Sequence, residues 1–283
     1  MGGAIKHSDY SVLRPHPELE IKPVDGFGTQ EQIRKILLTE RPDAVLMITD
    51  PRQFFFVWSM ADEIQQICPI TYWTIWDNDP FPDFNDVWYK STDLLNCISW
   101  KTYELLKPHY PEKTNYIPHA YGKHQFFPMP EHEVKAIQKD HFGHRADWFK
   151  VLWINRNATR KLPADVLASF KEFLDELEKK YGHRKALMLV HSNPLDIEGT
   201  NMYAVSEHFK MQENVMFSVE QIPQQYINVL HNITDTCINI SKAEGFGLSV
   251  LQTLQVGKPA IALTTGGMTR QIIDWRDGSE NGV

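Results

Sequence analysis

The stretch from Glu244 to Gln252, Glu-Gly-Phe-Gly-Leu-Ser-Val-Leu-Gln, combines an acidic side chain, two glycines and the start of a helix. Glycine lets backbone N–H groups approach a ligand closely. A helix N-terminus offers unpaired N–H donors and the positive end of a dipole to an anion. The Glu244 carboxylate can accept hydrogen bonds from sugar hydroxyls beside them. The pattern therefore predicts a site that holds a sugar and a phosphate side by side.

A second stretch brings three cations close together: Arg156, Arg160 and Lys161. They follow residues 151–154, an apolar run that predicts a strand, and ligands of open α/β sheets bind at the carboxyl ends of the strands. A guanidinium offers a planar fork to phosphate oxygens, and a lysine adds a mobile point charge. The alternative is a solvated basic loop that caps a helix.

The elements that must position these two stretches follow an alternating pattern. Short apolar runs alternate with amphipathic stretches, which indicates βα units around parallel sheets. A series of such units ends near residue 118, and a linker rich in His, Pro and Phe leads to a second series that begins at residue 150. We therefore predict an α/β chain with two domains, 1–148 and 149–283. The strands are expected at 42–49, 70–76, 94–99, 115–118, 151–154, 186–190, 215–218, 236–240 and 260–263.

The glycine-rich stretch, with the Gly257-Lys-Pro that follows it, resembles the donor-site signature of family 4 glycosyltransferases, also called glycosyl transferases group 1. These are retaining enzymes of the GT-B fold. The resemblance implies two Rossmann-like parallel-sheet domains that face a cleft. The family signature is Glu-x7-Glu, and in this chain Gln252 takes the place of the second glutamate.

The resemblance implies roles for both stretches. Arg156 and Lys161 match the family's pair that grips the donor diphosphate, and Glu244 matches the residue that orients the transferred sugar. The Gln252 amide would face the nucleotide ribose; the alternative is a capping box with Ser249, in which it bonds the backbone. No metal ion is implied, because protein cations take that role, and no separate cofactor is implied, because a nucleotide-diphosphate sugar is the donor substrate. The predicted donor-binding residues are Gly245, Phe246, Gly247, Leu248 and Gln252. The Gly266-Gly267 pair could make another close backbone approach, and a plain turn is the favoured interpretation.

The acceptor side is predicted from the loop after residue 76, where many family members carry a histidine followed by an aspartate. This chain has Trp76 and Asp77, so the histidine's role is not carried over. Asp77 and Asp79 could bind sugar hydroxyls, while Trp76 could pack against a sugar face; an Asx turn before a proline is the alternative. The aromatic run at 54–58 suggests peripheral membrane contact, and a buried helix is the favoured interpretation.

The predicted function is transfer of a sugar from a nucleotide-diphosphate donor to a carbohydrate or lipid-linked acceptor, with retention of configuration. The resemblance covers roughly residues 30–283, and both domains lack βα units that the family normally has, so a truncated chain is expected. Two alternatives remain open. One is a nucleotide-sugar epimerase or hydrolase of the same fold, and the other is an inactive nucleotide-sugar-binding fragment.

Composition excludes several other classes. The chain has 283 residues, with 29 basic and 36 acidic side chains and a formal net charge of −7, which argues against a nucleic-acid surface. No run reaches the roughly 20 apolar residues that a membrane-spanning helix needs, and the N-terminus has no apolar signal region. The three cysteines lie in or beside apolar runs, which predicts reduced thiols in a cytoplasmic protein.

Overall fold

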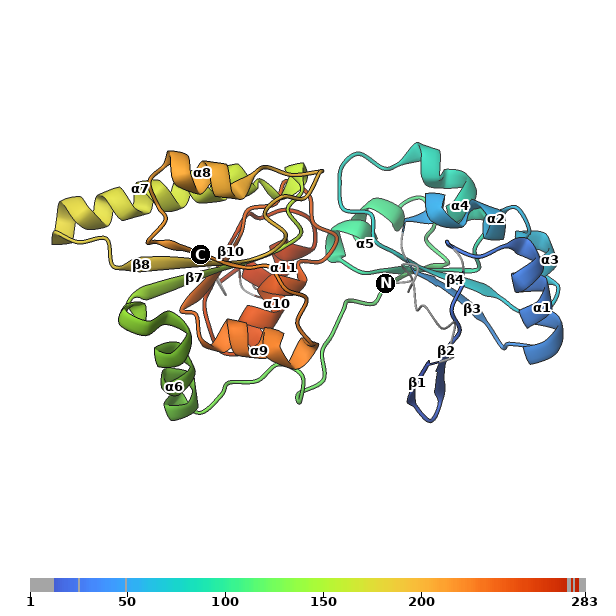
Figure 1. Cartoon of the computed structure of the whole chain (residues 1–283). Coiled ribbons are helices and arrows are strands. Elements are labelled where there is room, and N and C mark those ends of the chain that lie inside the picture. Colours follow the sequence, from blue (N-terminus) through green and yellow to red (C-terminus); the bar gives the residue numbers. More distant parts are fainter. Residues whose placement is uncertain (1–12, 25, 49, 274–275, 277, 280–283) are drawn as a thin grey trace. The chain divides into compact units, whose positions relative to one another are not determined.

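The computed structural model describes residues 13–24, 26–48, 50–273, 276 and 278–279. Backbone contacts divide the chain into two units, Met1–Pro118 and His119–Val283, whose elements are labelled in Figure 1. We expected a boundary near residue 148, but the chain divides thirty residues earlier. The predicted linker therefore belongs to the C-terminal unit. Each unit is described by itself below.

The N-terminal unit contains a four-stranded parallel sheet in the order β3-β4-β5-β6. Its strands are β3 (Val45–Ile48), β4 (Ile70–Thr74), β5 (Leu94–Cys97) and β6 (Thr114–Tyr116). A hairpin of β1 (Leu13–His16) and β2 (Leu19–Ile21) precedes it. The helices are α1 (Gln30–Glu40), α2 (Phe55–Trp58), α3 (Ala61–Gln65), α4 (Asp86–Lys90) and α5 (Trp100–Leu106).

The aromatic run at 54–58 forms a short 3-10 turn and α2 rather than one long helix. Val57 and Trp58 are buried in the N-terminal core, and the Trp58 indole N–H donates to the Pro51 carbonyl at 2.9 Å. Phe55 is 68% exposed. The favoured interpretation of this segment as buried therefore holds for Val57 and Trp58 but not for Phe55. No described helix is long and apolar enough to cross a membrane.

The C-terminal unit is a five-stranded, fully parallel sheet in the order β11-β10-β7-β8-β9. The chain starts in the middle at β7, runs outward to β9, and then returns to the other side of β7 with β10. In doubly wound sheets, ligands bind at the carboxyl ends of the two strands beside such a reversal, which here are β7 and β10. The strands are β7 (Phe149–Ile154), β8 (Ala186–His191), β9 (Val215–Ser218), β10 (Thr236–Asn239) and β11 (Ala260–Ala262).

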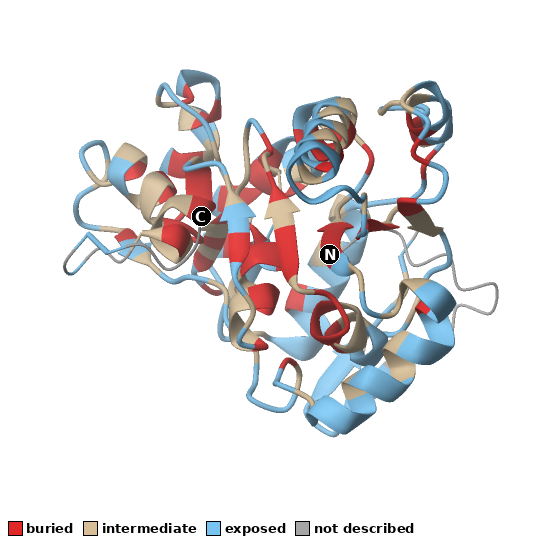
Figure 2. Cartoon of the chain, turned by 90° about the vertical axis from the view of Figure 1, so that its left-hand side faces the viewer, coloured by how far each residue is buried: buried red, intermediate tan, exposed pale blue. Residues whose placement is uncertain are grey.

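Helices cover both faces of this sheet, as a parallel sheet requires. In Figure 1, α7 (Pro163–Tyr181) and α8 (Met202–His208) lie on one side, and α6 (Glu131–Phe142) and α9 (Gln224–Asn232) lie on the other. Alternate strand residues point to opposite faces, so Trp153 packs with α7 while Leu152 packs with Phe142 of α6. Buried residues accordingly gather along the strands and the inner faces of the helices (Figure 2).

The two expected α/β units with parallel sheets are confirmed, and the predicted strands are present with ends shifted by a few residues. The helix α7 begins at Pro163, because proline is well suited to the first helical position. Its apolar stripe is buried at Val166, Phe170 and Leu174. The boundary differed because α6 contributes Phe142 to the core beneath β7 and β8, a contact that local composition does not encode.

Replacing Phe142 by alanine tests whether the linker helix is part of the C-terminal core. We expect the free energy of unfolding to fall by about 3–5 kcal/mol, the usual cost of emptying a buried phenylalanine site. Phe55→Ala, at an exposed ring, is the matched control and should change it little. Urea unfolding measures both. Equal, small effects of the two substitutions would contradict the assignment of α6 to this core.

Candidate active site

The loop between β10 and α10 (Leu248–Gln255) carries the glycine-rich stretch. The helix begins directly after Gly247, whose φ of +90° belongs to the left-handed region that favours glycine. Val250 N donates to the Gly247 carbonyl at 3.1 Å, so the backbone N–H groups of Leu248 and Ser249 precede the first intrahelical bond. The helix N-terminus therefore lies where the sequence predicted it. The capping-box alternative is wrong, because Gly247 is the N-cap and has no side-chain cap.

A second glycine pair, Gly266 and Gly267, packs against the backbone of this loop. A Cβ on Gly266 would lie 2.1 Å from the Glu244 carbonyl oxygen, and one on Gly267 would lie 2.4 Å from the Phe246 Cα. The Gly267 N–H donates to the Glu244 carbonyl at 2.9 Å. The pair is thus more than the expected turn. It lets the chain after β11 pack directly against the loop, which fixes the direction in which the Glu244 side chain leaves the backbone.

Lys161 and Glu244 form an ion pair that joins the two predicted stretches. Lys161 ends a short 3-10 turn after β7 and is 6% exposed, and the Glu244 side chain is 15% exposed. Arg160 adds a guanidinium nitrogen 3.4 Å from the same carboxylate oxygen and donates to the Ala243 carbonyl at 2.6 Å. Two of the three cations therefore meet the acid at the carboxyl ends of β7 and β10.

Arg156, the third cation, is held apart from Glu244 by two other acids. Its guanidinium contacts Asp196 at 2.9 Å and Glu198 at 3.0 Å, and its side chain is 58% exposed. The hydrogen bond from Arg156 lowers the pKa of the Asp196 carboxyl. An exposed pair such as Arg156 and Glu198 contributes little to stability. The Arg156 guanidinium thus lies exposed in the segment that follows β7.

Gln252 is 8% exposed and bonds other side chains of the C-terminal unit. Its amide nitrogen donates to the Tyr121 hydroxyl at 2.8 Å, and its carbonyl oxygen lies 3.1 Å from Nε2 of His231. Nδ1 of the same imidazole lies 2.9 Å from the Thr253 hydroxyl. Burial lowers the pKa of His231 to about 4. The predicted contact of Gln252 with a ribose stays a prediction, and Tyr121 and His231 are partners that sequence reasoning missed.

The predicted acceptor-side residues lie on one loop of the N-terminal unit, after β4. The Trp76 carbonyl accepts from the Thr102 hydroxyl at 2.6 Å, and its ring meets Phe84 edge-on at 5.4 Å. Asp79 forms an ion pair with Lys101 at 2.7 Å. Asp77 is half-buried beside them. Their predicted roles toward an acceptor stay predictions.

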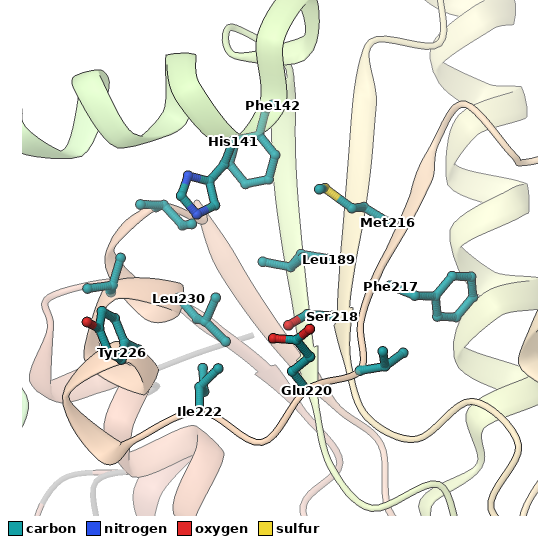
Figure 3. A pocket seen from close by; sticks show the side chains of 13 residues that line it. His141, Phe142, Leu189, Met216, Phe217, Ser218, Glu220, Ile222, Tyr226 and Leu230 are labelled. Atoms are coloured by element: carbon teal, nitrogen blue, oxygen red, sulfur yellow. The ribbon is translucent and has the colours of Figure 1, made fainter.

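A cavity of about 380 Å³ lies within the C-terminal unit, between α6, α9 and the end of β9 (Figure 3). Its walls are mainly apolar, among them Phe142, Leu189 and Leu230, and Glu220 lies near its centre in the view. None of the predicted donor residues lines it. No described lysine or arginine lines it, so its chemistry does not suit a nucleotide diphosphate. Among the described residues, no group of three His, Cys, Asp or Glu side chains could hold a metal ion.

The close approach of Gly266 to the Glu244 carbonyl can be tested by substitution to alanine. The added Cβ must push the loop away, and φ of +50° adds a conformational cost of roughly 1–2 kcal/mol. Gly182→Ala is the matched control, since its φ is +72° and no atom lies within 4 Å of the added Cβ. Thermal unfolding should show a clearly larger loss for Gly266→Ala. Equal losses would mean that the loop is not packed in this way.

The buried His231 predicts a pH dependence of stability. Its pKa is about 4 in the folded chain and near the ordinary 6.5 in the unfolded chain, so the unfolded state binds the extra proton between these values. Stability should therefore be lost as the pH falls from 6.5 toward 4, at up to about 1.4 kcal/mol per pH unit. Urea unfolding at several pH values across this window should show that the free energy of unfolding depends less steeply on pH in His231→Gln than in the wild type. An unchanged slope would contradict a neutral, buried imidazole.

Comparisons with known proteins agree with this geometry. The family model of glycosyl transferases group 1 matches residues 135–280, which include both predicted stretches. No curated protein sequence matches the chain. Among solved structures, sucrose-phosphate synthase from Thermosynechococcus elongatus aligns with a TM-score of 0.70 at 15% identity, over 93% of this chain and 70% of that one.

Two further structures show the same fold. Anabaena HepE in complex with UDP and glucose aligns at a TM-score of 0.66 and 14% identity, over 85% of this chain and 64% of that one. The catalytic domain of starch synthase IV from Arabidopsis thaliana, bound to ADP and acarbose, aligns at a TM-score of 0.63 and 14% identity. The alignment covers 89% of this chain and 64% of that one. The chain thus spans about two thirds of the length of these structures. It has the GT-B fold and belongs to the family of glycosyl transferases group 1.

Proposed function

We propose that this chain transfers a sugar from a nucleotide-diphosphate donor to an acceptor hydroxyl, with retention of configuration. The observation that carries the proposal is the meeting of Lys161, Glu244 and the N-terminus of α10 at the carboxyl ends of β7 and β10. A cation and a helix N-terminus suit a diphosphate, and a carboxylate beside them suits sugar hydroxyls. The Anabaena and Arabidopsis structures, which contain UDP and ADP, support the choice of a nucleotide donor.

The donor would compete for charged groups that form ion pairs with one another in this structure. Lys161 would turn from Glu244 to a phosphate oxygen, which leaves the carboxylate to accept from the sugar. Arg156 would leave Glu198, its exposed partner, and grip the diphosphate. A loop held in place by the Gly266 and Gly267 backbone needs little rearrangement for this, and preorganised donors are what stabilise charge effectively in a transition state.

The proposed reaction is a substitution on the face of the sugar that carries the leaving group. The bond between the anomeric carbon and the phosphate oxygen breaks, and its electron pair stays on the diphosphate. The acceptor oxygen forms its bond to the same face of that carbon and gives its proton to a leaving phosphate oxygen. Lys161, Arg156 and the α10 N-terminus stabilise the developing negative charge. Protein cations serve here, so the proposal needs no metal ion, and Glu244 orients the sugar without attacking it.

The acceptor is proposed to be a carbohydrate or a lipid-linked sugar. Trp76 offers an aromatic face to a sugar ring, and Asp77 and Asp79 offer carboxylates to its hydroxyls. A cytoplasmic location is proposed from the three cysteines, which are all free and buried.

A nucleotide-sugar-binding module without transfer is the second candidate. The observation that favours it is Gln252, a neutral residue at the position of the family's second acid, whose amide is engaged by Tyr121 and His231. Binding without turnover in the presence of varied acceptors would support this candidate.

Substitutions at the ion pair test the proposed transfer. Calorimetry with uridine, guanosine and adenosine diphosphates identifies the base, and product analysis with the matching nucleotide sugars follows turnover. Lys161→Ala should lower kcat by about 10²–10³, the usual cost of removing one group that stabilises a developing anion. Glu244→Gln should lower it as well, since the sugar loses a charged acceptor. Lys179→Ala, at a 78% exposed side chain on α7, is the control.

Thermal unfolding of each variant separates lost chemistry from lost structure. Turnover that is unchanged in folded Lys161→Ala and Glu244→Gln would contradict the proposal. A new nucleotide sugar formed without any acceptor would instead indicate an epimerase.

A further inference from the structure

The loop between β8 and α8, residues 192–201, is joined to the segment that follows β7. The two strands are parallel neighbours, so both segments start at the same edge of the sheet. The Asn157 side chain accepts from the Thr200 N–H at 3.1 Å and donates to the Thr200 carbonyl at 2.7 Å. The Thr159 N–H and hydroxyl both donate to the Glu198 carbonyl at 2.9 Å. The backbone of the loop is therefore tied to the segment that carries Arg156.

Close packing and internal hydrogen bonds hold this loop in one conformation. A Cβ on Gly199 would lie 2.1 Å from Oδ1 of Asn157, a side chain that is itself fully buried. The Gly199 N–H donates to the Asp196 carbonyl at 3.0 Å, and the Asp196 N–H donates to the Asn193 carbonyl at 3.3 Å. The position of Asp196 with respect to Arg156 is consequently set by the backbone.

The two acids of the loop contact Arg156 in different ways. Asp196 accepts from Nε of Arg156 at 2.9 Å through Oδ2 and from Nη2 at 3.3 Å through Oδ1. Oδ1 of Asp196 also accepts from the Glu198 N–H at 3.0 Å, and this side chain is 15% exposed. The Glu198 carboxylate meets Nη1 at 3.0 Å, and its side chain is 59% exposed. Asp196 is thus held through both oxygens, whereas Glu198 is an exposed partner.

This arrangement divides the guanidinium into two edges. A guanidinium carries five N–H donors in a rigid, planar fork. Asp196 takes the edge formed by Nε and Nη2, and Glu198 lies at Nη1 on the other side. The edge formed by Nη1 and Nη2 is the one that suits two oxygens of a phosphate. A phosphate that replaced Glu198 would therefore meet a guanidinium that Asp196 still holds.

We infer that Asp196 is a positioning residue for the donor diphosphate: it orients the Arg156 guanidinium toward a phosphate, and Glu198 is the anion that the phosphate replaces. The inference rests on the proposed function, because it takes a diphosphate as the ligand of Arg156. Asp196 itself does not touch the ligand. Ordering a long, exposed side chain weakens binding by about 2- to 10-fold, and a guanidinium held by Asp196 avoids that loss.

The alternative is that Asp196, like Glu198, only competes with the phosphate for Arg156. Two substitutions separate these roles, because each removes one negative charge from the same loop. A purely electrostatic effect would have the same sign in both variants. A positioning role for Asp196 gives effects of opposite sign.

Calorimetry tests the inference with whichever of uridine, guanosine and adenosine diphosphate binds the wild type most tightly. Asp196→Asn should weaken binding about 2- to 10-fold. The asparagine oxygen can keep the bond to the Glu198 N–H, but its NH₂ group then faces a donor at Nε of Arg156. Glu198→Gln should tighten binding by about 1.5- to 5-fold, because an exposed competing anion is removed.

A second background shows whether Asp196 acts through Arg156. In Arg156→Ala, the further change Asp196→Asn should no longer weaken binding, and such non-additivity is the sign of a shared interaction. Glu176→Gln, at a 71% exposed acid on α7, is the matched control and should bind as the wild type does. Thermal unfolding checks that each variant is folded. If Asp196→Asn is not, Arg156→Lys takes its place: it keeps the charge, lacks the fork and should weaken binding by a similar factor.

Several results would overturn the inference and leave the proposed function intact. They are unchanged or tighter binding by folded Asp196→Asn, a loss that persists beside Arg156→Ala, and wild-type affinity in Arg156→Lys. A wild type that binds none of the three diphosphates would instead contradict the proposed function.

Discussion

The ion pair between Lys161 and Glu244 is the interaction on which the site depends. Both side chains are largely buried, and a buried charge is tolerated only when it is paired and hydrogen-bonded. The pair therefore forces the loop after β7 and the loop after β10 to meet. The Lys242 N–H donates to the Arg160 carbonyl at 2.9 Å, and this backbone hydrogen bond joins the same two loops. The cation and the acid are consequently held side by side by the fold itself.

Glycine makes this junction sterically feasible. Gly247 takes a left-handed conformation that starts α10 directly behind Glu244, and Gly266 leaves room for the Glu244 backbone. The helix N-terminus, the acid and the lysine are thereby fixed with respect to one another through the backbone. Tyr121 adds a contact from outside the strand series, because the linker packs on α10.

Much of the fold and part of the site could be predicted from the sequence, because they rest on local signals. Runs such as residues 186–190 show buried parallel strands, and Gly247 marks the start of α10. The partners of Arg156 and Gln252 could not be predicted, since Asp196 and Tyr121 lie far away in the sequence and reach them only through tertiary packing. The domain boundary was placed too late for the same reason.

The proposed function requires that a nucleotide diphosphate binds where the loops after β7 and β10 meet. Amide hydrogen exchange with and without the best-binding nucleoside diphosphate tests it most directly, because exchange reports local protection along the whole chain. We expect slower exchange at residues 155–161 and 244–252, with little change at residues 216–230 around the apolar cavity. Protection confined to residues 216–230, with none at the two loops, would contradict it.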